Sequence, residues 1–362
     1  MSKVARVGIV GSGIFGQWHL KAFTQVQNEG KAELVAISDL IEEKRNKAAK
    51  EYGVKPYADY REMIEKEKLD AVSVVTPDAL HGDIAATGLE MGCHVLCEKP
   101  MATTMDDCRR IVEASHKRPN QIFMVDFHKR LDMYHIELER VVREGELGRI
   151  QYGYAYMEDR IEVSRDWFKL WPGGASPFWF IGTHFVDLIR WVIKSNGVMV
   201  FATGHRDKLR GLGLDFWDSL SAQIVFENGA TFTVDACWIL PGGFEAIVNQ
   251  GIRVIGTDGI FEVDSQDRGA GACLKGKTQQ SYNLGVYAEK HTPDGKIKYG
   301  GYGIESIMEF GYHVHHVLNG GSVNDLKGLY ANADDGLEVS KICIAAHMSA
   351  EADGKVIELN TL

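Results

Sequence analysis

The chain has 362 residues, of which 45% are hydrophobic and 25% charged, and its formal net charge at pH 7 is -10. This composition is typical of a globular protein with a sizeable core, and the length suits two domains. The negative charge and the lack of a basic run argue against nucleic acid and anionic membranes as partners. No window approaches the ~18 unbroken apolar residues of a membrane-spanning helix.

The cysteines are scattered through the chain, which does not indicate a disulfide framework. Cys93 and Cys97 lie four residues apart on a predicted buried strand, without a second pair at zinc spacing, so we expect core thiols and no metal site. Ser2, Lys3 and Val4 lead directly into the first predicted strand without a signal-peptide pattern. Together these features predict a cytoplasmic protein.

The first motif is a glycine-rich turn between an apolar run at 7–10 and a helical pattern. Gly11, Gly13 and Gly16 stand in the order G-x-G-x-x-G, which suits the pyrophosphate of a dinucleotide. They allow, in turn, a tight turn, close approach of the backbone to phosphate, and close packing of helix on sheet. The helix N-terminus adds free N–H groups and partial positive charge. We predict that this loop, including Ile14 and Phe15, binds the cofactor, although ordinary strand–helix turns also contain such glycines.

The second predicted strand, 33–39, ends in Asp39, near the spacing at which a carboxylate accepts hydrogen bonds from the adenosine ribose. Leu40 and Ile41 follow it, rather than a serine and an arginine, which favours NAD over NADP. Lys44 and Arg45 lie nearby, so NADP stays the weaker alternative.

Strands and helices alternate several times before residue 127, which predicts a doubly wound parallel sheet. Ligands of such sheets bind beyond the carboxyl ends of the strands. The residues at or just past these ends are Gly11, Asp39, Thr76, Pro77, His81, Glu98, Lys99 and Phe127. From this set we predict cofactor contacts for Thr76, Pro77, His81, Glu98 and Lys99, in addition to Gly11 and Asp39.

Lys99 directly follows a predicted buried strand and precedes Pro100, which restricts it to extended geometry. The sequence does not decide whether the Lys99-Pro100 bond is cis or trans. A lysine there would point its ammonium into the cofactor crevice, where it could orient a substrate hydroxyl and stabilise developing alkoxide charge. A surface pair with Glu98 is the structural alternative.

The second half contains many predicted antiparallel strands, at 150–160, 198–204, 216–226, 231–238, 252–255 and 260–263, which argue for an open sheet. A helix carries His184 and Asp187 three residues apart, on one face. An acid beside a histidine orients the ring and raises its basicity, as a proton acceptor near neutral pH requires. Such pairs are also common as plain polar surface.

Several motifs together resemble the Gfo/Idh/MocA oxidoreductases, the family of glucose–fructose oxidoreductase and inositol dehydrogenase. The matching segments are GSGIFG at 11–16, the acid-terminated strand, TPDALH at 76–81, CEKP at 97–100, GELGRI at 145–150, GTHFVDLIRW at 182–191, IGTDGIFEVD at 255–264 and GYGIESI at 301–307. They run in family order over nearly the whole chain. The combination of EKP with a later G-x-H-x-x-D is quite specific.

The resemblance implies an N-terminal Rossmann domain over 1–127 and a C-terminal α+β domain over 128–362 whose large, mostly antiparallel sheet pairs subunits into a homodimer or homotetramer. It also implies that His184 is the general base, Lys99 its partner at the substrate oxygen, and Asp187 the end of the relay. Relatives similar to inositol dehydrogenase carry an acid four residues before this histidine. Phe180 stands there instead and replaces a hydrogen-bond acceptor for sugar hydroxyls by an apolar wall.

Further substrate contacts are predicted for residues just beyond a strand end, His128, Lys129 and Arg130, and for Tyr302. The aromatic residues Trp167, Phe168, Trp171 and Trp179 could stack on a sugar, although such clusters are more often core. His313, His315 and His316 do not share one helical face, so no metal site is expected there.

The expected function is therefore an NAD-dependent oxidoreductase that transfers a hydride between nicotinamide and a secondary alcohol or ketone of a sugar, inositol or related polyol. Two alternatives stay open. One is an NAD-dependent glycoside hydrolase of the same fold with no net redox change, and the other is a dinucleotide-binding regulator without turnover.

Overall fold

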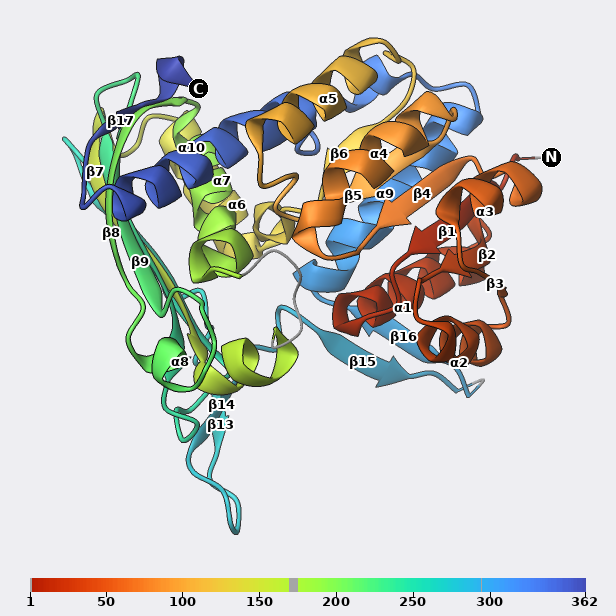
Figure 1. Cartoon of the computed structure of the whole chain (residues 1–362), viewed down its shortest axis with the longest axis horizontal. Helices are drawn as coiled ribbons and strands as arrows, with labels where there is room; N and C mark the ends of the chain where they lie inside the picture. Colours follow the sequence, from red (N-terminus) through yellow and green to blue (C-terminus); the bar gives the residue numbers. More distant parts are fainter. Residues whose placement is uncertain (1, 169–174, 294) are drawn as a thin grey trace. The chain divides into compact units, whose positions relative to one another are not determined.

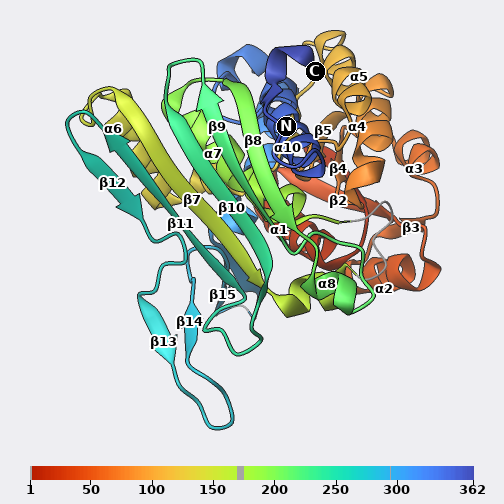
Figure 2. The ribbon, with the colours of Figure 1, turned by 60° about the vertical axis from the view of Figure 1, so that its left-hand side comes forward.

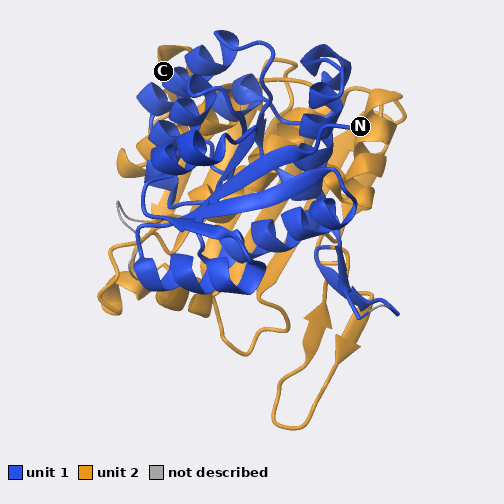
Figure 3. Cartoon of the chain, turned by 90° about the vertical axis from the view of Figure 1, so that its right-hand side faces the viewer, with its two compact units in different colours: residues 1–128, 286–337 blue, residues 129–285, 338–362 orange. Residues whose placement is uncertain are grey.

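In the computed structural model, which describes residues 2–168, 175–293 and 295–362, the chain divides into two compact units (Figure 3). Unit 1 comprises residues 1–128 and 286–337, and unit 2 comprises 129–285 and 338–362. The sequence predicted residues 286–337 in the second domain, but in the structure they belong to unit 1.

Unit 1 is built on a parallel sheet with strand order β3-β2-β1-β4-β5-β6, which confirms the predicted doubly wound sheet (Figure 1). Its strands are β1 (Ala5–Val10), β2 (Ala32–Ser38), β3 (Lys55–Tyr57), β4 (Ala71–Val74), β5 (His94–Cys97) and β6 (Phe123–Val125). The helices between them are α1 (Ile14–Asn28), α2 (Glu42–Tyr52), α3 (Tyr60–Glu67), α4 (His81–Glu90) and α5 (Met105–His116). Every residue of β4 and β5 is buried, as expected of central strands covered on both faces.

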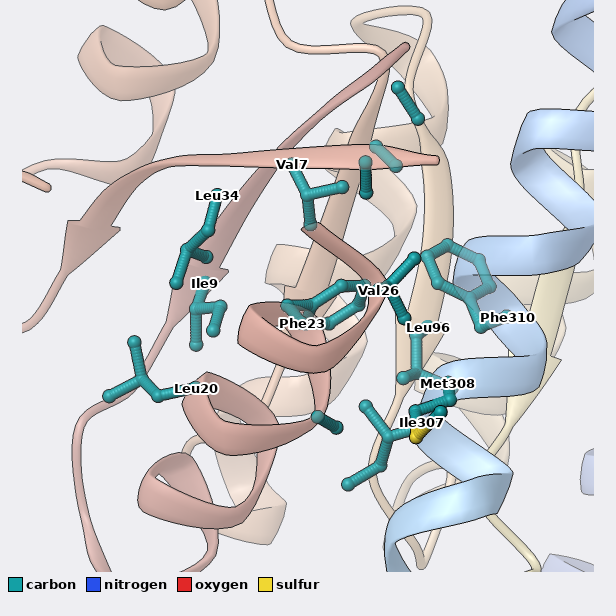
Figure 4. Close-up of a cluster of buried hydrophobic side chains, with 14 of the residues drawn as sticks. Val7, Ile9, Leu20, Phe23, Val26, Leu34, Leu96, Ile307, Met308 and Phe310 are labelled. Carbon is teal, nitrogen blue, oxygen red and sulfur yellow. The ribbon is translucent and has the colours of Figure 1, made fainter. Parts of the chain in front are cut away.

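The core of unit 1 explains why 286–337 belongs to it. Helix α9 (Tyr302–Leu318) packs on α1 and contributes Ile307 and Phe310 to the same apolar cluster as Val7 and Phe23 (Figure 4). The rings of Phe23 and Phe310 meet edge to face, with centroids 6.4 Å apart. The hairpin β15 (Ala288–His291) and β16 (Ile297–Gly300) precedes this helix.

Unit 2 contains the large sheet, in the order β12-β11-β7-β10-β9-β8-β17. Its neighbouring strands run antiparallel except for β7 and β10, which are parallel. The strands are β7 (Ile150–Arg160), β8 (Gly197–His205), β9 (Ser219–Phe226), β10 (Thr231–Leu240), β11 (Val248–Gly256), β12 (Ile260–Val263) and β17 (Ile357–Glu358). A smaller hairpin pairs β13 (Ala270–Ala272) with β14 (Gln280–Tyr282).

Helices cover one face of this sheet. Helices α6 (Met133–Arg143) and α7 (Thr183–Ile193) lie over it, whereas Figures 1 and 2 show no helix on the opposite face among the described residues. Burial alternates along β7 accordingly, with Ala155 and Met157 buried and Tyr152 and Tyr154 exposed. The remaining helices are α8 (Lys208–Gly211) and α10 (Ala333–Glu351), which runs from unit 1 into unit 2.

The predicted strand 216–226 is too long at its start, because β9 begins at Ser219. The Asp218 carboxylate instead accepts hydrogen bonds from the N–H groups of residues 207–209, at 2.6 to 2.8 Å. This buried cap holds the loop that precedes β9, and the regular strand begins only after it. No helix in the described part of the chain has the length and apolar character needed to cross a membrane.

The packing of α9 gives a test of its place in unit 1. Phe310→Ala should lower the free energy of unfolding by ~3–5 kcal/mol, because the fully buried ring fills space against Phe23. Urea denaturation followed by circular dichroism measures the change. Leu329→Ala, in the same segment but 67% exposed, is the control and should change it by less than about 0.5 kcal/mol. A Phe310→Ala variant as stable as wild type would contradict the packing.

Candidate functional site: the strand ends of unit 1 and helix α7 of unit 2

The glycine-rich loop between β1 and α1 has a geometry that requires glycine at two positions. Gly11 has φ +109°, and a Cβ there would lie 2.3 Å from the carbonyl oxygen of Val75. A Cβ on Gly16 would lie 2.5 Å from the carbonyl oxygen of Gly11. At Gly13, by contrast, a Cβ would meet no described atom within 4 Å.

The same loop leaves room and hydrogen-bond donors for an anion. Helix α1 begins at Ile14 after Gly13, and no side chain caps its first N–H groups. Open space beside Gly13 together with an uncapped helix N-terminus fits a dinucleotide pyrophosphate.

Asp39, at the end of β2, is held in place beside this loop. Its Oδ2 accepts hydrogen bonds from the Ser12 N–H at 2.9 Å and the Ser12 hydroxyl at 2.6 Å, and its Oδ1 accepts from the Ile41 N–H at 2.8 Å. Arg45 donates to the backbone carbonyls of Asp39 and Leu40, at 3.4 and 3.3 Å. The carboxylate is thus fixed next to the glycines, where the ribose of a bound dinucleotide would lie.

His81, a predicted cofactor residue, is almost fully buried and ties two strand ends together. Its ring nitrogens lie 2.9 Å from the carbonyl oxygen of Thr76 and 2.8 Å from that of Pro100. The loops after β4 and β5, which carry Thr76, Pro77 and Lys99, are therefore held at one edge of the sheet. The Lys99-Pro100 bond, which the sequence left undecided, is cis.

Both carboxylate oxygens of Glu98 have hydrogen-bond partners within unit 1. Its Oε1 lies 3.1 Å from Nε2 of His19, and its Oε2 accepts a hydrogen bond from the Lys99 N–H at 3.0 Å. Because a carboxylate can only accept, His19 Nε2–H is the donor, and in the neutral ring Nδ1 accepts from the Ser73 hydroxyl at 2.7 Å. Burial alone would raise the pKa of Glu98, but the hydrogen bond from His19 and the charges of Lys99 and His128 outweigh this effect and lower the pKa.

Lys99 is 7% exposed, and its Nζ lies 5.6 Å from the centroid of the Phe15 ring, so its ammonium lies beside the glycine-rich loop. His128 and Tyr302, both predicted substrate contacts, face each other within unit 1 with ring centroids 5.5 Å apart. The structure therefore gathers the predicted cofactor residues, Lys99, His128 and Tyr302 in one unit.

In unit 2, His184 and Asp187 are both buried on α7. Asp187 forms a two-pronged ion pair with Arg130, whose Nε and Nη2 donate at 2.8 and 2.6 Å. Arg130, predicted to contact substrate, thus has its guanidinium bound to Asp187. The relay from His184 to Asp187, and the pairing of His184 with Lys99 of unit 1, stay predictions.

Lys129 is buried next to this helix. Its Nζ donates to Oε1 of Gln250 at 2.5 Å and lies 4.9 Å from the centroid of the Phe185 ring. Burial lowers the pKa of Lys129 to about 8, against the opposing charge of Asp132.

The aromatic residues before α7 have different environments. Phe180 packs on Phe168, with centroids 4.6 Å apart, and on Trp238, in an apolar cluster of unit 2. Trp179 stacks on His347 at 4.8 Å, whereas Trp167 is 39% exposed. Trp171 lies outside the described residues. Phe180 is therefore part of an apolar wall, and Trp167 has the most accessible ring of those described.

The three histidines of α9 have separate partners. His315 lies 3.0 Å from the Ser2 hydroxyl, His316 lies 3.0 Å from Asp325, and the ring of His313 faces Tyr330. Burial lowers the pKa of His313 to about 4. These contacts give each ring its own structural role.

Sequence reasoning missed two residues of the unit 1 site, His19 and Asp126. His19 belongs to the buried face of α1 three residues after Gly16, and Asp126 directly follows β6. The available signals were a histidine on the apolar face of the helix after the glycines and an acid at a strand end. Phe127 was among the residues predicted at that strand end, but Asp126 was not.

Comparisons with known proteins agree with this architecture. A model of an oxidoreductase family with an NAD-binding Rossmann fold, GFO/IDH/MocA, matches residues 5–127, and one of the GFO/IDH/MocA C-terminal domain matches 135–262. The structure of scyllo-inositol dehydrogenase from Lactobacillus casei with bound NAD(H) and scyllo-inositol aligns with TM-score 0.77 and 21% identity, over 99% of this chain and 100% of that one. GenD2 from gentamicin A biosynthesis, in complex with NAD, aligns with TM-score 0.79 and 23% identity over 99% and 97% of the two chains.

Curated relatives include inositol 2-dehydrogenase 2 of Saccharopolyspora erythraea, 30% identical over 63% of this chain and 65% of that protein. An inositol 2-dehydrogenase of Salmonella typhimurium is 30% identical over 40% of this chain and 43% of that protein. The chain thus spans less than two thirds of the length of these relatives. Because the models of both domains of one family match successive parts of the chain, residues 5–127 and 135–262, the chain belongs to the GFO/IDH/MocA family of oxidoreductases.

Proposed function

We propose that the protein is an NAD-dependent dehydrogenase that acts on a secondary alcohol of a polyol such as an inositol. The observation that carries this proposal is Lys99, a buried lysine whose backbone is held by Glu98 and whose ammonium lies beside the glycine-rich loop. A cation at this place suits an oxygen that gains negative charge during reaction. The names of the relatives support the substrate class.

Unit 1 would hold the cofactor. Gly11, Gly13 and the start of α1 would bind the pyrophosphate, and Asp39 would accept from the ribose hydroxyls. Thr76, Pro77 and His81 would shape the floor of the site from the strand ends. NAD, when bound, accepts or supplies the hydride. The fixed carboxylate of Asp39 would repel a 2′-phosphate, which favours NAD over NADP.

Unit 2 would supply the proton acceptor. In this proposal His184 takes the proton of the hydroxyl while Lys99 donates a hydrogen bond to the same oxygen. The ion pair with Arg130 fixes Asp187 and so helps to hold α7, on which His184 lies. The apolar wall at Phe180 would lie where inositol dehydrogenases carry an acid, so polar contacts to the substrate would come from other residues, such as His128 and Tyr302.

We also propose that the open face of the large sheet pairs subunits into a homodimer or homotetramer. Its exposed side chains include Tyr152 and Tyr154. A reducing, cytoplasmic location fits the cysteines, most of which are buried.

The catalytic assignment predicts that Lys99→Ala and His184→Ala each lower turnover by roughly 10²-fold or more and leave NAD binding nearly unchanged. Purified enzyme is incubated with NAD and a panel of inositols, free sugars and aryl glycosides, while NADH absorbance and aglycone release are followed separately. Lys117→Ala, an exposed lysine at the end of α5, is the control.

Wild-type rates in both variants would contradict the assignment of the two residues. Aglycone release without NADH would indicate the glycoside hydrolase instead. NAD binding without any turnover would indicate the regulator.

The role of Asp39 predicts a change of cofactor preference. Asp39→Ser removes the negative charge that faces the ribose, so the ratio of the Kd for NADP to the Kd for NAD should fall by about tenfold or more, which is ~1.4 kcal/mol. Titration calorimetry with both cofactors measures the ratio, and Asp106→Ser, an exposed acid in the same unit, serves as control. An unchanged ratio would show that Asp39 does not select the cofactor.

A further inference from the structure

Unit 1 contains a buried group of ionisable side chains, one of which, Glu98, directly precedes Lys99. His19 is fully buried, Glu98 is 9% exposed and Asp126 is 2% exposed, and one polar atom of each lies within 4.8 Å of the others. The three residues come from different elements: α1, the end of β5 and the end of β6. None of the roles proposed above uses Asp126.

The backbone fixes Asp126 beside Glu98. The Asp126 N–H donates to the carbonyl oxygen of Cys97 at 2.9 Å, which continues the pairing of β6 with β5 past the last strand residues. The Oδ1 atom of the Asp126 carboxyl is buried and has no hydrogen-bond partner among the described residues. The two carboxyl groups are therefore held close together in a place that water hardly reaches.

Two carboxylates held this close without water cannot both be charged at low cost, so something must neutralise one of them. A divalent cation on His19, Glu98 and Asp126 is one candidate. It would add two positive charges next to the Lys99 ammonium, whose charge already acts on both carboxyls. A single proton leaves the carboxyl pair with one negative charge, which balances one ammonium, so the charge balance favours the proton.

We propose that Asp126 is a positioning residue for Lys99: it carries a proton next to Glu98, so that the carboxyl pair presents a single negative charge to the Lys99 ammonium. This inference rests on the proposed function, because it assigns Lys99 to the substrate oxygen. The step is a reversible loss of one proton from the Asp126 carboxyl to solvent.

The environment places the proton on Asp126 rather than on Glu98. Burial and the charge of Glu98 together raise the pKa of Asp126 to about 7, against the opposing charge of Lys99. Glu98 keeps its charge because His19 donates to it. Four charged or titratable groups act on Glu98, on Asp126 or on their surroundings. They are His19 from α1, Asp78 after β4, Lys99 after β5 and His128 after β6.

This arrangement determines how turnover changes with pH. Below neutral pH, Asp126 is neutral and the Lys99 ammonium faces one carboxylate. When the pH rises through the Asp126 pKa, a second negative charge appears next to the Lys99 ammonium. This charge partly cancels the stabilisation that the ammonium gives to the substrate oxygen. Turnover in wild type is then weakened at alkaline pH relative to a variant in which this position stays neutral.

The test uses Asp126→Asn, which has the shape of the protonated acid and cannot ionise. Infrared spectra of wild type minus Asp126→Asn, without substrate, should show the C=O band of a protonated carboxylic acid at pH 6, and this band should disappear by pH 9. The ratio of kcat in Asp126→Asn to kcat in wild type should rise by roughly threefold or more over the same range. Glu309→Gln, which removes another carboxyl of raised pKa from α9, should leave both results unchanged.

Several outcomes would overturn the proposal. The first is the absence of the band at pH 6, and the second is a kcat ratio that does not change with pH, which would leave Asp126 a merely structural acid. The third is a divalent metal retained in equimolar amount by wild type and lost in Asp126→Asn. If the variant does not fold, the infrared titration of wild type against Asp126→Ser decides the first point.

Failure of the proposed function gives a different pattern. In that case Lys99→Ala keeps full turnover, or no polyol is oxidised, while the infrared band still reports whether Asp126 holds a proton. A band that titrates together with an inert Lys99 would refute the link to Lys99 and thereby the positioning role.

Discussion

The buried carboxylate of Glu98 is the constraint on which the site in unit 1 depends. One of its oxygens accepts a hydrogen bond from His19 of α1, and the other accepts one from the backbone N–H of Lys99. The other nitrogen of the His19 ring is hydrogen-bonded to the hydroxyl of Ser73 in β4. The helix that follows the glycine-rich loop and the residue that follows β5 are thereby joined by a charge-assisted network. Such bonds are stronger than neutral ones, and a buried acceptor left without donors would be costly. Glu98 therefore joins the backbone of Lys99 to the helix that follows the glycine-rich loop.

A second buried charge pair organises unit 2. Asp187 on α7 is fully buried and takes two hydrogen bonds from Arg130, which lies in the segment before α6. Removal of either partner would leave an uncompensated charge inside the protein. The pair thus fixes the helix that carries His184 to the start of the unit. In each unit, a residue proposed to contact the substrate lies close in sequence to a buried carboxylate that the packing requires. In unit 1 this is Lys99 after Glu98, and in unit 2 it is His184 three residues before Asp187.

Local patterns predicted much of this architecture. Glycine is required at position 16 by the nearby backbone of Gly11, and at position 11 by the backbone of Val75 at the end of the adjacent strand. The alternation of strands and helices follows from hydrophobic periodicity. The acid at the end of β2 and the lysine after β5 also lie where the sequence placed them. These features depend on short segments, and so the sequence alone carries enough information about them.

What the sequence did not predict depends on contacts between distant segments. The place of 286–337 in unit 1 follows from the packing of Phe310 on Phe23, and the pair of Arg130 with Asp187 joins residues on different elements. His19 and Asp126 looked like ordinary residues of a helix face and a strand end until the sheet order placed the end of β6 beside the end of β5, which Glu98 and Lys99 follow. The contacts of the His81 ring with two carbonyl groups of neighbouring loops also join segments distant in the sequence, whereas its contact with the cofactor stays a prediction.

The most direct test of the central claim is a crystal structure of the protein with NAD and an inositol bound together. The account predicts that Lys99 Nζ and a ring nitrogen of His184 both lie within hydrogen-bond distance of one substrate oxygen, and that the carbon bearing this oxygen faces the nicotinamide. A complex in which either side chain points away from the bound substrate, or in which the two lie at separate sites, would contradict it.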